Sequence, residues 1–156
     1  MKIKEIMHPK PFSLRRDDNL SSAAQIMWER DVGVLPVTDQ DDHVIGVITD
    51  RDIAMAAFTQ GKVLLDIPVE RSMSKNLYSC NQDDELDQAQ ALMQQHQVRR
   101  IPILDNNKKL AGMLSLNDIA CAYSARPKKD IKSEVVAETL AAICKHRPFY
   151  SIAKVA

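Results

Sequence analysis

The sequence predicts an α/β fold with mixed sheets, in which two copies of a β-α-β-β-α unit pack together with pseudo-twofold symmetry. The main observation is an internal repeat: VGVLPVTDQDDHVIGVITDRDIA (32–54) aligns without a gap with VRRIPILDNNKKLAGMLSLNDIA (98–120). The offset is 66 residues throughout, as in the pair Gly46 and Gly112. The second observation is that apolar residues within each copy follow strand and helix periods in alternation. Together these observations indicate a duplicated α/β unit.

The first half of each copy is predicted to be a short strand followed by a helix. In the first copy, residues 12–14 form the strand, and the polar cluster at 17–19 is suited to capping a helix. The apolar residues that follow recur at i, i+3, i+4 and i+7, which places them on one helical face. These residues are Leu20, Ala23, Ala24 and Met27.

The second half of each copy is predicted to be a β-hairpin followed by a second helix. Residues 34–37 and 44–49 are apolar and rich in β-branched side chains, and they flank a polar turn. The helix then runs from about residue 50 to 58, and Gly61 is placed to end it. The second copy repeats this order, with strands at 77–80, 101–104 and 110–114 and helices at 86–95 and 116–125.

We divide the chain into a first repeat (1–62), a second repeat (63–126) and a C-terminal helical tail (127–156). A parallel crossover followed by a hairpin gives each repeat a three-stranded mixed sheet with both helices on one face. One such unit buries little apolar surface, so the two repeats should pack against each other. The tail should form a helix whose partner is not evident from the sequence, a second copy of the chain being one option. Its apolar positions are Ile131, Val135, Leu140 and Ile143.

Composition argues against several functional classes. The 21 Lys and Arg residues balance the 21 Asp and Glu residues, so no basic excess is available for phosphate contacts and we expect no nucleic-acid partner. No apolar run has the length of a signal peptide or a membrane span, so we expect a cytoplasmic protein without membrane contact. The cysteines Cys80, Cys121 and Cys144 lack a C-x-x-C pair and form no zinc-like spacing with the histidines. We therefore expect reduced thiols and no metal site.

Each hairpin ends in the pattern G-h-x-[ST]-x-x-D, where h is apolar. The pattern places Thr49 at a strand end and Asp52 one turn into the next helix, and it does the same for Ser115 and Asp118. Free amides and the positive end of the helix dipole lie at such a helix start. A carboxylate there can accept hydrogen bonds from ribose hydroxyls, and the hydroxyl and amides can donate to a phosphate. The alternative is a capping box, in which these side chains only satisfy amides of their own helix.

The two hairpins resemble the cystathionine-β-synthase (CBS) domain, and the tandem pair over about residues 3–125 resembles a Bateman module. The chain is most similar to small stand-alone bacterial CBS-pair proteins, including the hypoxic-response type. The resemblance implies a non-catalytic regulatory module with no required cofactor. It would bind an adenosine-type ligand, such as AMP, ADP or ATP, in the cleft between the repeats. The resemblance further implies a homodimer that signals through dimer or partner contacts, to a regulated enzyme or transporter. The competing hypothesis is a protein-interaction scaffold with degenerate ligand sites.

The resemblance also assigns roles to individual residues. The carboxylates of Asp52 and Asp118 would hold a ribose, with the hydroxyls of Thr49 and Ser115 beside the phosphate. Backbone groups of the first hairpin strand would receive the base, and a hydroxyl of the opening strand would line the same cleft. These last positions are Val34, Leu35 and Pro36 with Ser13 in the first copy, and Arg100, Ile101 and Pro102 with Ser79 in the second.

Three arginines are candidates for contact with a phosphate, the alternative being that they are solvated surface charges. They are Arg51, Arg99 and Arg100. The second copy has Arg99 and Arg100 where the first has Gly33 and Val34. Because the copies differ at these positions, we expect one cleft to bind ligand well and the other weakly.

Overall fold

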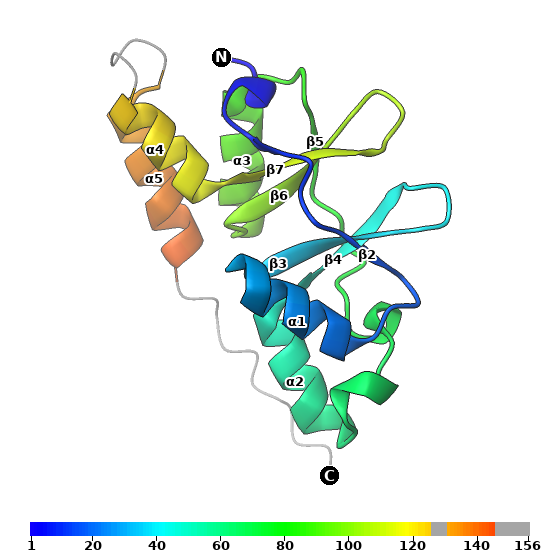
Figure 1. The fold of residues 1–156 in the computed structure, drawn as a ribbon. Coiled ribbons are helices and arrows are strands. Elements are labelled where there is room, and N and C mark those ends of the chain that lie inside the picture. The colour runs from blue at the N-terminus through cyan, green and yellow to red at the C-terminus, as the bar shows by residue number, and fades with distance from the viewer. Residues whose placement is uncertain (126–130, 146–156) are drawn as a thin grey trace.

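A three-stranded mixed sheet forms the framework of the first repeat in the computed structural model, which describes residues 1–125 and 131–145 (Figure 1). Strand β2 (Leu14–Arg15) runs parallel to β3 (Val34–Thr38), and β3 pairs antiparallel with β4 (Val44–Thr49). The mixed α/β architecture predicted from the sequence is therefore confirmed. The opening strand lies slightly later than the expected 12–14, because pairing with β3 begins only at Leu14.

The sheet of the second repeat has four strands, in the order β1-β7-β6-β5. Its strands are β1 (His8–Pro9), β5 (Cys80–Asn81), β6 (Arg100–Leu104) and β7 (Leu110–Ser115). The prediction of three strands was wrong for this repeat, because β1 comes from the chain's N-terminal segment and pairs antiparallel with β7. Strand β5 begins at Cys80, later than expected, because its pairing with β6 starts there.

Two helices flank each sheet. They are α1 (Leu20–Arg30) and α2 (Asp50–Gln60) in the first repeat, and α3 (Leu86–His96) and α4 (Leu116–Ala125) in the second. Asn19 caps α1 by accepting a 2.9 Å hydrogen bond from the amide of Ser22, as expected for the polar cluster that precedes the helix. Gly61 ends α2 in the left-handed conformation with φ of 58°, as predicted. None of the helices among the described residues is long and apolar enough to cross a membrane.

Each repeat is completed by the segment that precedes the other repeat. Ile3, in a 3₁₀ turn (Ile3–Glu5), is fully buried in the second core, and its amide donates to the carbonyl of Asp84 at 3.0 Å. After the linker turn Leu64–Asp66, Ile67 and Val69 are fully buried in the first core. The amide of Val69, in the turn Val69–Arg71, donates to the carbonyl of Asp18 at 2.7 Å. Both cores therefore contain residues from either side of the expected boundary at residue 62.

The tail helix α5 (Ser133–Cys144) packs on α3 and α4 of the same chain. Gln94 of α3 donates a 2.8 Å hydrogen bond to the fully buried hydroxyl of Thr139. The face that α5 turns inward contains Val136, Thr139 and Ile143, so Leu140 points outward and is 49% exposed. Residues 126–130 and 146–156 of the predicted tail lie outside the described part of the chain.

Candidate functional site

The first motif lies where β4 ends and α2 begins. Thr49 is the last residue of β4 and the N-cap of α2, and its hydroxyl oxygen accepts a 3.2 Å hydrogen bond from the amide of Asp52. Oδ2 of Asp52 accepts in return from the amide and the hydroxyl of Thr49, at 2.9 and 2.7 Å. These reciprocal bonds form a capping box. The motif spacing had allowed this capping role as the alternative to ligand binding.

The second motif has the same geometry where β7 meets α4. Oδ2 of Asp118 accepts from the amide and hydroxyl of Ser115 at 2.7 and 2.5 Å, and Asp118 donates back from its amide at 3.2 Å. Both carboxylates are half-buried and engage their caps through Oδ2 alone. Within the described residues, Oδ1 of Asp52 and Asp118 accepts no hydrogen bond. Each capping carboxylate can therefore still accept a hydrogen bond from a ligand.

The hairpin register brings the other predicted residues beside each motif. Val34 lies opposite Thr49 on β3 and β4, and Arg100 lies opposite Ser115 on β6 and β7. The first amide of each following helix donates to the residue before its strand, from Asp50 to Gly33 at 3.3 Å and from Leu116 to Arg99 at 2.9 Å. These hydrogen bonds hold the start of α2 beside the start of β3, and the start of α4 beside the start of β6.

One edge of β3 is open beside the first motif. Strand β2 pairs with β3 only at Val37 and Thr38, which leaves the edge along 34–36 without a strand partner among the described residues. Ser13 immediately precedes β2 and is exposed. The side chain of Leu35 is buried, and Pro36 is buried too, so a ligand at this edge would meet mainly backbone.

The second repeat repeats this arrangement. Strand β5 pairs with β6 only at Ile103 and Leu104, so the edge along 100–102 has no strand partner in the described chain. Ser79 immediately precedes β5 and is half-buried. Ile101 is fully buried and Pro102 is buried, which again leaves mainly backbone at the edge.

Arg100 extends from the second repeat to the first. A Cβ atom built on Gly33 would lie 3.6 Å from Nη1 of Arg100 and 3.0 Å from Oδ2 of Asp50. Arg51, Arg99 and Arg100 are exposed, and none of them forms a salt bridge with another described residue. Arg100 of the second repeat therefore lies near the start of α2 in the first repeat.

Sequence reasoning did not select Gly33 and Asp50 as site residues. Gly33 leaves room for the guanidinium of Arg100, and Asp50 places a carboxylate close to the same glycine. The available signal was the repeat comparison, because Gly33 and Asp50 align with Arg99 and Leu116 in the second copy. Their proximity to Arg100 depends on how the repeats pack, which the alignment does not contain.

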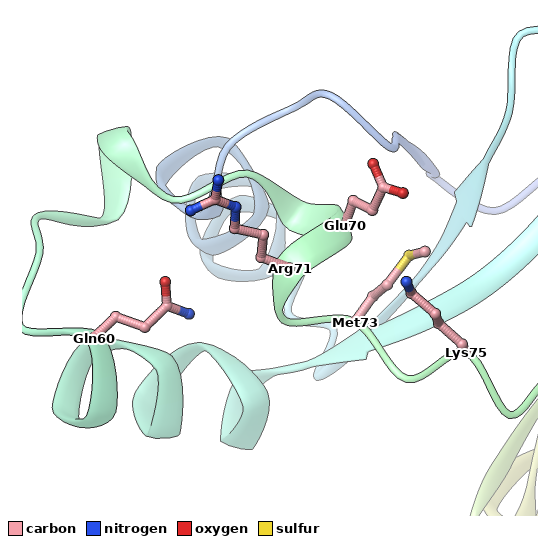
Figure 2. A pocket seen from close by; sticks show the side chains of 5 residues that line it. All are labelled: Gln60, Glu70, Arg71, Met73 and Lys75. Carbon is pink, nitrogen blue, oxygen red and sulfur yellow. The ribbon is translucent and has the colours of Figure 1, made fainter.

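Two surface hollows lie apart from the motifs. One, of about 420 Å³, lies between the hairpin turns and is lined by Ser13 together with residues such as Arg15, Asp42 and Lys109. The other, of about 570 Å³, is lined by Gln60, Glu70, Arg71, Met73 and Lys75. Figure 2 shows that these five side chains are spread along the linker and the end of α2 and do not converge on one point. This second hollow contains none of the predicted site residues.

A cluster of potential metal ligands occurs in the first hairpin turn. Ligand atoms of Asp39, Asp41 and His43 lie within 4.8 Å of one another. However, Oδ1 of Asp39 accepts hydrogen bonds from the amides of Asp41 and His43, both at 2.9 Å. The conformation of the turn thus accounts for the cluster.

The CBS domain family matches residues 3–58 and 66–125, and the chain belongs to this family. A CBS domain-containing protein of Bacillus subtilis, YhcV, is 37% identical over 118 residues, which cover 76% of this chain and 82% of YhcV. Hypoxic response protein 1 of Mycobacterium tuberculosis is 29% identical over 117 residues, covering 75% of this chain and 81% of that protein. The chain therefore contains a tandem pair of CBS domains and is similar to small CBS-pair proteins of bacteria.

Two solved structures have the same fold. The CBS domain pair of protein MJ0100, in complex with 5′-methylthioadenosine and S-adenosyl-L-methionine, has a TM-score of 0.72 and 22% identity, covering 81% of this chain and 98% of that chain. CBSX2 in complex with AMP has a TM-score of 0.70 and 22% identity, covering 80% and 96% of the two chains. CBS pairs are in general regulatory, non-catalytic units.

Proposed function

We propose that this protein is a cytoplasmic regulatory module that binds an adenosine-type ligand, such as AMP, ADP or ATP, between its two CBS repeats and catalyses no reaction. The observation that carries the proposal is the position of Asp52 and Asp118. Each is a half-buried carboxylate at a helix start, with Oδ1 free of described partners and an open strand edge beside it. The complexes of MJ0100 and CBSX2 with adenosine compounds support the ligand class.

The chemistry of the proposed site follows from these positions. The ribose hydroxyls donate to the free carboxylate oxygen of Asp52 or Asp118, while Oδ2 holds the cap. The base lies against the backbone at 34–36 or 100–102, beside Ser13 or Ser79. The hydroxyls of Thr49 and Ser115 and the guanidiniums of Arg51, Arg99 and Arg100 then face the phosphate.

The two clefts should differ in affinity. Arg100 stands at the strand start of the second repeat, where the first repeat has Val34. Its guanidinium lies near Gly33, next to the start of α2 in the first repeat. The carboxylate of Asp50 at that helix start repels a phosphate, whereas the second repeat has the uncharged Leu116 at the aligned position. Calorimetry should resolve one strong and one weak site, whereas two equal, independent sites would contradict this asymmetry.

Ligand would act by favouring one arrangement of the two repeats over another, in proportion to its difference in affinity for the two. We propose that a homodimer passes this change on to a regulated enzyme or transporter. The competing function is an interaction scaffold without ligand. A specific observation favours it: capping alone accounts for the hydrogen bonds that the carboxylates of Asp52 and Asp118 accept.

A thermal-shift screen with AMP, ADP, ATP, NAD and S-adenosylmethionine tests the proposal. A ligand at about 100 times its Kd should stabilise the protein by about 2.7 kcal/mol. Asp52→Asn and Asp118→Asn retain a carbonyl oxygen for the cap but lose the charge, so at least one of them should abolish the shift. Asp87→Asn, which alters an exposed acid in the first turn of α3, should leave it unchanged. No shift with any compound would contradict ligand binding and favour the scaffold.

A further inference from the structure

Three cationic side chains line the hollow of about 420 Å³ that lies between the turns of the two hairpins. They are Lys10, Arg15 and Lys109. Pockets for small ligands usually have volumes of about 300–1,000 Å³ and are mostly apolar. This hollow has a suitable size, but charged and hydroxyl-bearing side chains make up most of its lining. Its chemistry therefore suits a small charged compound.

The cations come from both repeats. Arg15 lies on β2 in the first sheet, whereas Lys109 directly precedes β7 in the second. Lys10 directly follows β1, and its amide donates to the carbonyl of Ala111 on β7 at 3.3 Å, so it is attached to the second sheet. Figure 1 shows the turns of both hairpins on the same side of the molecule. A ligand that contacts all three cations is therefore bound by both repeats at once.

Asp42 is the counter-ion of two of these cations. Its Oδ1 lies 2.7 Å from Nη2 of Arg15, and its Oδ2 lies 3.9 Å from Nζ of Lys109. The other acid of the lining, Asp18, accepts a 2.7 Å hydrogen bond from the amide of Arg15. Lys10 forms no salt bridge with any described residue. One carboxylate thus serves two cations, and the third cation has none.

The guanidinium of Arg15 is held in position by the first hairpin. Its Nη1 donates to the carbonyl of Asp39 and lies 3.5 Å from the hydroxyl of Thr38. Thr38 is only 4% exposed, and its hydroxyl donates to the carbonyl of Leu14 at 3.3 Å. A guanidinium that is already fixed loses little freedom when it binds an anion.

The second repeat forms the corresponding strands without these charges. The positions that align with the three cations hold two asparagines and a histidine: Asn76, Asn81 and His43. In place of the counter-ion Asp42, the second copy has Lys108. The fold of the repeat therefore does not require the three cations, which occur together only at this one of the two equivalent places.

We infer that the hollow binds a diphosphate group, whose oxygens replace the carboxylate of Asp42 beside Arg15 and Lys109 and also contact Lys10. A guanidinium forms paired hydrogen bonds with phosphate oxygens, and a lysine ammonium binds phosphate as a point charge. A diphosphate has a larger negative charge than one carboxylate and more oxygens, so it can serve three cations where Asp42 serves two. Because these cations belong to both repeats, the bound group favours the arrangement in which the hairpin turns lie together.

Calorimetric titration of the full chain with pyrophosphate, in magnesium-free buffer at fixed ionic strength, tests the inference. We expect saturable binding that sulfate does not reproduce. Lys10→Gln and Lys109→Gln should each weaken it about two- to fivefold, the range for exposed ion pairs. Lys108→Gln removes the same charge one residue before Lys109 but outside the lining, so it is the matched control and should leave the affinity unchanged.

Asp42→Asn gives a result that a damaged fold cannot imitate. The diphosphate no longer has to displace a carboxylate from Arg15 and Lys109, so this variant should bind pyrophosphate about two- to fivefold more tightly. Asp41→Asn, exposed in the same turn and outside the lining, should bind as wild type does. No binding to wild type, no gain in Asp42→Asn, or equal losses in the Lys108 and Lys109 variants would each overturn the inference.

Two nucleotides separate this site from the adenosine clefts and identify the source of the group. Neither Asp52 nor Asp118 lines the hollow, so saturating AMP should not abolish pyrophosphate binding, and its loss would overturn a separate site. If AMP does not bind at all, the proposed function fails while the result with pyrophosphate stands. UDP presents the same group without adenine: binding like that of pyrophosphate supports a nucleotide as the source, and weaker binding supports free diphosphate.

Discussion

A Cβ atom on Gly46 would lie 2.5 Å from the carbonyl oxygen of Ser74. The two segments meet so closely because the amide of Ser74 donates to the carbonyl of Val47 at 2.9 Å, and the amide of Val47 donates back to Ser74 at 3.2 Å. In the second repeat, a Cβ on Gly112 would lie 2.9 Å from the carbonyl oxygen of His8. The glycine of each motif thus allows the segment leading into the other repeat to pair closely with β4 or β7.

We expect Gly46→Ala to lower the free energy of unfolding by about 1–3 kcal/mol, the usual range for an overpacked interior. The contact is with backbone, so the linker segment must move away. Gly112→Ala should cost less, because its nearest contact, at 2.5 Å, is with the flexible side chain of Met7, and its backbone contact, with His8, is longer, at 2.9 Å. Urea denaturation of both variants measures the difference. Equal midpoints for wild type and Gly46→Ala would contradict this role of the glycine.

The sequence predicted the elements well because their signals are local. The helix stripe beginning at Leu20, the cap at Asn19 and the left-handed Gly61 each depend on residues within a few positions, and the structure confirms them. The exchange of segments could not be predicted in this way. Ile3 and Val69 occupy equivalent positions in the repeat pattern, and the pattern shows that each is apolar but not which core receives it.

For the candidate site too, the sequence predicted the local geometry but not the contact between the two repeats. The motif spacing predicted that Thr49 and Asp52 share a helix start, and the reciprocal hydrogen bonds are those of the capping alternative. The approach of Arg100 to Gly33 was not predictable, because it is set by the packing of one repeat on the other. Whether the free oxygen of Asp52 holds a ribose stays a proposal.

Gln90 offers a test of the packing beneath α5. Its side chain is only 2% exposed, and its Nε2 donates no hydrogen bond to any described residue. A buried polar group without a partner costs about 1–3 kcal/mol, so an apolar side chain of similar length should be favoured there. We expect Gln90→Met to raise the free energy of unfolding by about 1 kcal/mol.

The measurement for Gln90→Met is the urea midpoint, with Gln95→Met as the control. Gln95 is exposed on the same helix, so its replacement removes no buried polar group. If Gln90→Met lowers stability while Gln95→Met does not, the amide of Gln90 must have a stabilising partner in the folded protein.

Glu85 gives a pH-dependent contribution to stability. Hydrogen bonds from the amine of Lys2, at 2.8 Å, and from the amine of Met1, at 2.9 Å, lower the pKa of Glu85 to about 2. A carboxyl whose pKa is depressed in the folded state stabilises it above the unfolded pKa of 4.5, and this contribution is lost as pH falls towards 2. Glu85→Gln should therefore have a lower urea midpoint than wild type at pH 7.

The difference between Glu85→Gln and wild type should shrink between pH 4.5 and pH 2. The effect should be small at every pH, because the ion pairs are exposed. Asp87→Asn again serves as the control, since it removes an acid from the same turn. A difference that is constant with pH would show that the charge of Glu85 is not the cause.

The three cysteines should differ in reactivity. Cys80 is 9% exposed, and burial raises the pKa of its thiol to about 11, so little thiolate forms at pH 8. Cys121 on α4 and Cys144 on α5 are both exposed. A disulfide reagent such as dithiobis(nitrobenzoate) should label two thiols quickly and the third slowly in the native protein, and all three quickly in urea. Cys80→Ser should remove only the slow phase, and loss of a fast phase in that variant would contradict the burial of Cys80.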